Sequence, residues 1–77
     1  MKVRVFASLK EHFETEFELS GPARNTDELR SRLGEINAGA AEILKACRFA
    51  LGDSFIDNEF RLTENDTVII IPPSSGG

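Results

Sequence analysis

The residues best suited to chemistry stand at the carboxyl end of the sequence, which closes on Gly76-Gly77. Two residues without a β-carbon can thread a narrow channel and leave the α-carboxylate of Gly77 open to attack from several directions. We therefore expect the terminal carboxylate of Gly77 to be the reactive group of this chain.

The residues before this pair suit delivery into a partner. Pro72 and Pro73 predict the end of a strand, because neither residue can donate to a β-ladder and both favour extended backbone. Six extended residues cover roughly 20 Å at about 3.3 to 3.6 Å per residue. A frayed end is the alternative interpretation, since chain termini are commonly disordered. On the functional interpretation, a partner's pocket receives Pro73, Ser74, Ser75 and Gly76.

Few other side chains in the sequence offer chemistry. Cys47 is the single cysteine, and its apolar spacing predicts a small core residue rather than a sulfur relay. His12 is predicted to lie on the surface near a turn. The sequence contains no His, Cys and Asp spacing typical of a triad, no Cys-x-x-Cys or His cluster for a metal, and no glycine-rich phosphate loop. We therefore predict no bound metal or cofactor and no catalytic residues within this chain.

Length and composition limit the class of protein. The 77 residues suffice for one domain, and 40% hydrophobic with 29% charged residues favour a folded chain. A net charge of −4 argues against nucleic acid as the partner and favours a basic protein surface. No apolar run approaches the roughly 20 residues of a membrane span, and the first residues do not resemble a signal peptide. We expect no membrane partner and a cytoplasmic location.

The first half of the chain predicts two strands and two helices. Residues 2–7 and 15–19 alternate in polarity as strands do, and the two segments are close enough to form an antiparallel hairpin. Asn25 or Thr26 can cap a helix, with Glu28 in the position that a capping box requires. Helical spacing of apolar residues then predicts a main helix over residues 26–35 and a shorter one over residues 40–46.

The second half predicts three strands, over residues 48–51, 55–56 and 67–71. The order of elements suits an α+β fold of the ubiquitin-like β-grasp type, in which a mixed sheet of about five strands carries the main helix on one face. In this plan the first and last strands are parallel neighbours. The predicted organisation is therefore a β-grasp domain over residues 1–71 and a flexible tail over residues 72–77.

One face of the predicted sheet carries apolar side chains that the helix cannot cover. By alternation, the face opposite Val3 and Val68 holds Phe6, Ile69 and Ile71. We predict these three side chains to form a docking patch for a partner beside the tail.

The tail also carries a family resemblance. Pro72-Pro73 followed by Ser74-Ser75-Gly76-Gly77, with Leu62-Thr63 and Asp66 upstream, resembles the C-terminal region of the small, sulfur-carrying subunits of molybdopterin synthase. The opening strand and the helix start near Thr26 also fit, so the similarity covers most of the chain. Ser75 departs from the family, because several relatives have other small residues at this position.

The resemblance implies a sulfur carrier in molybdenum cofactor biosynthesis. An E1-like adenylating enzyme would use ATP to adenylate Gly77, and a sulfur donor protein would displace AMP to leave a thiocarboxylate. The thiocarboxylate would then attack a pterin precursor in the large subunit of the synthase. In that family the catalytic lysine and the substrate-binding basic residues belong to the large subunit, so this chain is implied to be a non-catalytic, sulfur-donating subunit.

Three other functions remain open on the sequence alone. A sulfur carrier of the thiamine pathway would share the fold, the tail and the activation chemistry. A ubiquitin-like protein modifier would also begin with an acyl-adenylate, but would join Gly77 to lysines of its targets. A structural or adaptor domain would make no chemical use of the tail.

Overall fold

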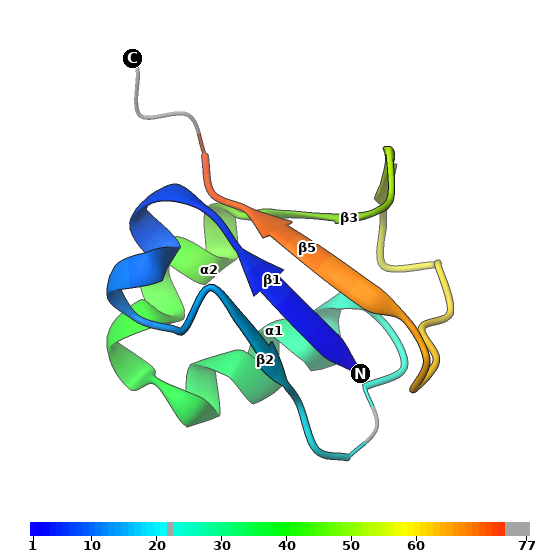
Figure 1. Ribbon diagram of the computed structural model, residues 1–77, viewed down its shortest axis with the longest axis horizontal. Helices are drawn as coiled ribbons and strands as arrows, with labels where there is room; N and C mark the ends of the chain where they lie inside the picture. Colours follow the sequence, from blue (N-terminus) through cyan, green and yellow to red (C-terminus); the bar gives the residue numbers. More distant parts are fainter. Residues whose placement is uncertain (22, 74–77) are drawn as a thin grey trace.

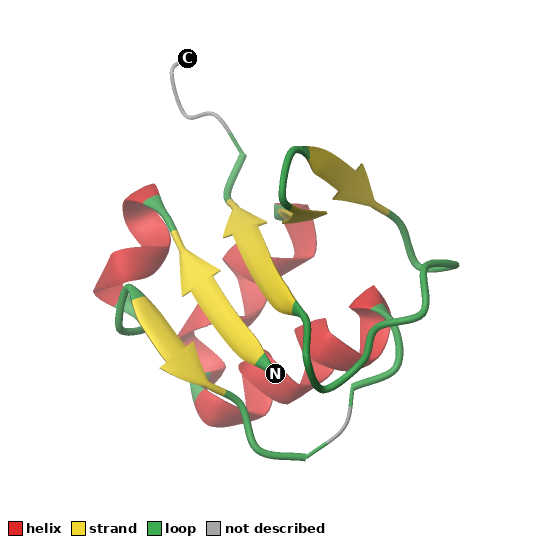
Figure 2. Ribbon diagram, turned by 45° about the vertical axis from the view of Figure 1, so that its right-hand side comes forward, coloured by secondary structure: helices red, strands yellow, loops and turns green. Residues whose placement is uncertain are grey.

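The computed structural model describes residues 1–21 and 23–73, which form a five-stranded sheet with helices packed on one face (Figures 1 and 2). The predicted α+β class is confirmed. In chain order the elements are β1 (Lys2–Val5), the 3-10 helix η1 (Ala7–Glu11), β2 (Glu16–Glu18), α1 (Thr26–Ile36), the 3-10 helix η2 (Ala38–Ala40), α2 (Ala41–Ala46), β3 (Arg48–Leu51), β4 (Ser54–Ile56) and β5 (Thr67–Ile71).

The strand order β2-β1-β5-β3-β4 places the last strand at the centre of the sheet. β1 and β5 are parallel, with Val3 opposite Val68, and the other neighbours are antiparallel. Figure 1 shows these two strands side by side and running in the same direction. β5 suits this place because its β-branched side chains are apolar on both faces. This topology confirms the predicted ubiquitin-like β-grasp fold.

The core lies between the sheet and the helices. One side chain in two along β1 and β5 points into it, as the predicted alternation requires. The helices contribute their own apolar stripe, and the cluster excludes solvent almost completely. The largest fully buried side chains are Val3, Val5, Leu9, Leu29, Leu33, Leu44, Phe49, Val68 and Ile70.

The start of α1 follows the predicted capping chemistry with one difference. The Asn25 side chain accepts a hydrogen bond from the Glu28 amide at 2.9 Å, as an N-cap residue does. The Glu28 carboxylate reaches back to the amide of Arg24 at 2.8 Å, one residue before the position of a standard capping box. α1 ends at Ile36, one residue beyond the predicted end.

The first strand is shorter than predicted. It ends at Val5 because Ala7 has a φ of 55°, in the left-handed region where a strand cannot continue, and the chain turns into η1 there. Phe6 still has extended backbone, so the alternation of faces continues through it. The second predicted strand also contracts to Glu16–Glu18, and the fourth begins at Ser54.

Candidate functional site

The tail leaves the centre of the sheet. β5 ends at Ile71, Pro72 is buried and Pro73 is exposed, so the two prolines end the strand as predicted. Because β1 runs parallel to β5, with Val5 opposite Ile70, the end of β5 lies beside Phe6. The predicted reactive and threading residues Ser74, Ser75, Gly76 and Gly77 lie outside the described residues, and their roles stay predictions.

The face of the sheet turned away from the helices carries an apolar band across three strands. Figure 2 shows the uncovered strands in front of the helices. The register places Ile69 of β5 opposite Ala50 of β3, and Ala50 opposite Phe55 of β4. Ala50 is buried, Ile69 is half-buried, and Phe55 is 53% exposed. This open face therefore holds a row of apolar side chains.

The three residues of the predicted patch share this face. Ile71 lies two residues after Ile69 on the same side of β5, and Phe6 continues β1 next to it with 38% of its surface exposed. Phe55 and Ala50 extend the patch, and sequence reasoning missed them. Their place could have been found from the sequence, because pairing the third and fourth predicted strands brings the side chains of Ala50 and Phe55 to this face. The docking surface, as used below, comprises Phe6, Ala50, Phe55, Ile69 and Ile71.

Charged side chains border the docking surface. Glu16 of β2 lies 3.3 Å from both the Lys2 ammonium and the Arg4 guanidinium. Arg48, at the start of β3, instead stacks on Phe55, with its Cζ atom 3.7 Å from the ring centroid. The strands of the open face carry Lys2, Arg4 and Arg48 against Glu16 and Glu18, so the acidity of the whole chain does not extend to this face.

Cys47 is a core residue, as predicted. It is 5% exposed, and its thiol donates a hydrogen bond to the Ile43 carbonyl at 3.1 Å. Burial raises the pKa of the Cys47 thiol, and the positive charge of Arg30 opposes this effect only in part. A neutral, enclosed thiol is a poor nucleophile, so the geometry does not favour a sulfur relay through this residue.

The titratable groups of the described residues form no metal site. His12 closes η1, is partly buried rather than fully on the surface, and accepts a hydrogen bond on its carbonyl from the Asn37 side chain at 2.9 Å. Among residues 1–21 and 23–73, no three His, Cys, Asp or Glu side chains are grouped as a metal ion needs. The same residues include no helix long and apolar enough to cross a membrane.

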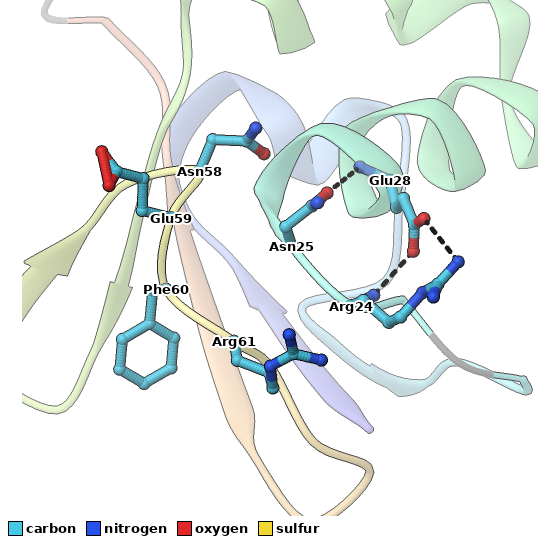
Figure 3. A pocket seen from close by; sticks show the side chains of 7 residues that line it. All are labelled: Arg24, Asn25, Glu28, Asn58, Glu59, Phe60 and Arg61. Atoms are coloured by element: carbon cyan, nitrogen blue, oxygen red, sulfur yellow. Dashed lines mark hydrogen bonds and ion pairs between the residues drawn. The ribbon is translucent and has the colours of Figure 1, made fainter.

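A polar pocket of about 350 Å³ lies between the start of α1 and the loop after β4 (Figure 3). Part of its polar lining is engaged within the chain: Glu28 binds Arg24, and the Asn58 side chain accepts hydrogen bonds from the Asp27 amide at 2.9 Å and the Thr26 hydroxyl at 3.3 Å. These two hydrogen bonds to Asn58 hold the loop after β4 against the start of α1. Its lining residues are Arg24, Asn25, Glu28, Asn58, Glu59, Phe60 and Arg61.

Comparison with known proteins shows the family to which this chain belongs. The model of the ThiS family matches residues 3–77, which include all five strands except the first residue of β1. This chain belongs to the ThiS family. The match also spans the predicted tail, so both parts of the candidate site lie within the family region.

Two proteins with molybdopterin names are similar to this chain over nearly its whole length. The molybdopterin synthase sulfur carrier subunit of Chlamydomonas reinhardtii is 33% identical over 82 residues, covering 100% of this chain and 98% of that protein. A chain in the solved complex of subunits 1 and 2 of the molybdopterin-converting factor of Helicobacter pylori 26695 is 32% identical, with a TM-score of 0.68 and coverage of 99% and 96%. The predicted kinship with molybdopterin synthase small subunits is confirmed.

Proposed function

We propose that this chain is the sulfur carrier subunit of a molybdopterin synthase and acts in molybdenum cofactor biosynthesis. The observation that carries the proposal is the end-to-end match to a named sulfur carrier subunit, with 33% identity over essentially the full length of both proteins. The structural neighbour, also matched over nearly its whole length, is named for the corresponding converting factor. The reaction takes place in the cytoplasm.

The chemistry proceeds through the α-carboxylate of Gly77. In an E1-like adenylating enzyme the carboxylate attacks the α-phosphorus of ATP, and pyrophosphate leaves. Sulfide supplied by a donor protein then attacks the acyl carbon and AMP leaves with one carboxylate oxygen, so that a thiocarboxylate remains. The sulfur of this group attacks the pterin precursor in the large subunit, and water cleaves the resulting acyl–sulfur bond to restore the carboxylate. The chain itself binds no cofactor.

The fold of this chain supplies a rigid base for that delivery. β5 is hydrogen-bonded on both sides, to β1 and β3, and Pro72 is buried, so the point where the tail begins is fixed relative to the sheet. The docking surface lies beside this point on the open face. We place the large subunit on the docking surface, where a partner that covers the apolar side chains also receives Pro73, Ser74, Ser75 and Gly76.

Reconstitution with purified components tests the function. The chain is incubated with ATP, the adenylating enzyme and the sulfur donor of the same cell, and its intact mass is measured. We expect the mass gain of one oxygen replaced by one sulfur, followed by loss of that sulfur when the large subunit and the pterin precursor are added. The control variant lacks Gly76 and Gly77. Equal sulfur delivery by the control would contradict the proposal.

The same reconstitution separates the alternatives. A protein modifier would produce isopeptide-linked ladders on target proteins in cell extract, and a thiamine-pathway carrier would give up its sulfur to the thiazole-forming enzyme and not to the large synthase subunit. The molybdopterin names of both relatives favour the first assignment.

A further inference from the structure

Arg48 places a positive charge within the apolar docking surface. It is the first residue of β3, stands opposite Ile71, and holds its guanidinium carbon 3.7 Å from the centroid of the Phe55 ring. Ile71 is the last residue of β5, so this charge lies next to the start of the tail. A protein that covers Phe55 and Ile71 must also cover Arg48.

Arg48 differs from the other cations of the open face in its electrostatic partners. Lys2 and Arg4 each lie 3.3 Å from an oxygen of the same Glu16 carboxylate, so each has an ion-pair partner within the chain. Within the described ranges 1–21 and 23–73, Arg48 has no carboxylate at ion-pair distance and no side-chain hydrogen bond. Its guanidinium lies over the ring of Phe55, and the residue as a whole is exposed.

This arrangement has a consequence for any protein that binds the face. A guanidinium carries five N–H donors in one plane, and the ring of Phe55 stacks on that plane without occupying the donors. The stacking orders the side chain before binding, so little rotamer freedom remains to be lost on association. When the surface is covered the donors lose water, and an unpaired charge in an interface is strongly unfavourable. The partner must therefore supply acceptors at this position.

We propose that Arg48 is the charged contact of the docking surface and that the large subunit places a carboxylate side chain against its guanidinium. A carboxylate matches the fork of the guanidinium with two parallel hydrogen bonds and neutralises its charge. The inference rests on the proposed function, because it takes the large subunit as the partner. The expected complement is acidic at this one point, whereas the net charge of −4 of the whole chain favours a basic partner surface elsewhere.

The affinity of the full chain for the large subunit tests this contact. Arg48→Met keeps a long side chain that packs on Phe55 but removes the charge and the donors, and Arg48→Glu reverses the charge. We expect the dissociation constant, measured by calorimetry at low salt, to rise roughly tenfold to hundredfold for Arg48→Met and further for Arg48→Glu. Added salt should weaken binding of the natural chain more than binding of Arg48→Met.

A matched control is available on the same molecule. Arg61 is also exposed and, among the described residues, has no carboxylate at ion-pair distance, but it lies in the loop after β4 away from the open face. Arg61→Glu makes the same change in net charge as Arg48→Glu, and we expect its affinity to equal that of the natural chain. Circular dichroism and the urea midpoint establish that each variant is folded.

Two results are decisive against the inference. If Arg48→Met and Arg48→Glu bind as tightly as the natural chain, the contact does not exist, while the proposed function stands. If the natural chain itself fails to bind the large subunit, the proposed function fails and the inference falls with it. A third result would support the inference: exchange of one acidic residue of the large subunit for lysine should restore binding to Arg48→Glu and to no other variant. If no acidic residue of the large subunit gives this rescue, the partner of Arg48 is not a carboxylate.

Discussion

Cys47 illustrates at the scale of one residue how burial decides reactivity. A thiol is a useful nucleophile only as a thiolate, and the enclosed position of Cys47 favours the neutral form. The hydrogen bond to the Ile43 carbonyl also uses the thiol proton and therefore acts in the same direction. The side chain thus contributes to packing and stays outside the sulfur chemistry.

A pH-dependent stability follows from this environment. The folded-state pKa of Cys47 is raised above the unfolded value of about 8.5, so its stabilising contribution is fully present below that value and is lost as the pH rises towards the folded-state pKa. We expect the urea midpoint of the natural chain to exceed that of Cys47→Ala at pH 7, and the difference to shrink at about pH 9.5. A difference that stays constant across this range would contradict the assignment.

At the scale of elements, Arg30 holds the two α-helices together. From the middle of α1 its Nε donates to the Leu44 carbonyl at 2.8 Å and a terminal nitrogen donates to the Cys47 carbonyl at 3.4 Å, so it caps the end of α2. Its guanidinium also lies 4.9 Å from the centroid of the Phe49 ring. Since α2 has six residues, this external cap contributes much of its stability.

Loss of this cap should destabilise the fold. We expect Arg30→Ala to lower the free energy of unfolding by about 1–3 kcal/mol, because the Cys47 carbonyl loses its guanidinium donor and the Leu44 carbonyl keeps the Cys47 amide as its donor. Urea denaturation with circular dichroism measures the change. Asp27→Ala is the matched control: it removes the exposed ion pair at 3.2 Å, which contributes about 0–1 kcal/mol, and a carboxylate in the first turn of α1. It leaves both guanidinium donors at the end of α2 in place. Equal effects of the two substitutions would show that the helix cap is not the source.

The elements that could be predicted are those with local signals. α1 followed from Asn25 and the spacing of its leucines, and β5 followed from its β-branched run, because capping and periodicity act within a few residues. The end of β1 did not follow, since Ala7 adopts a left-handed conformation that alanine does not signal.

The candidate site was partly predictable for a similar reason. Phe6, Ile69 and Ile71 followed from alternation within two strands. The stacking of Arg48 on Phe55 could not be predicted in this way. These residues are diagonal neighbours on β3 and β4, and their contact depends on how the two strands pair, which the pattern of a single strand does not reveal.

At the scale of the whole molecule, the two faces of the sheet differ in what covers them. The helices cover one face (Figure 2), and the other face carries the exposed side chains of Phe6 and Phe55. Exposed aromatic side chains on a small domain are typical of interfaces.

Substitution of these aromatic side chains measures their part in binding. We expect Phe6→Asp and Phe55→Asp each to weaken binding to the large subunit by more than about tenfold, since buried aromatic anchors contribute most of the binding energy in interfaces. Both side chains are exposed, so the urea midpoint should change little. Phe60→Asp is the matched control, because Phe60 is 40% exposed but lies in the loop beside the polar pocket. Comparable losses for all three variants would count against the docking surface.

The central position of β5 makes the fold depend on completion of the chain. A nascent or cleaved polypeptide that stops before Thr67 leaves β1–β2 and β3–β4 as two hairpins without the strand that joins them, and an isolated hairpin is marginally stable in water. Contact between β1 and β5 also spans nearly the whole sequence, which gives the domain a high contact order and makes this pairing slow relative to helix formation. We therefore expect incomplete copies to lack the assembled sheet on which the start of the tail stands.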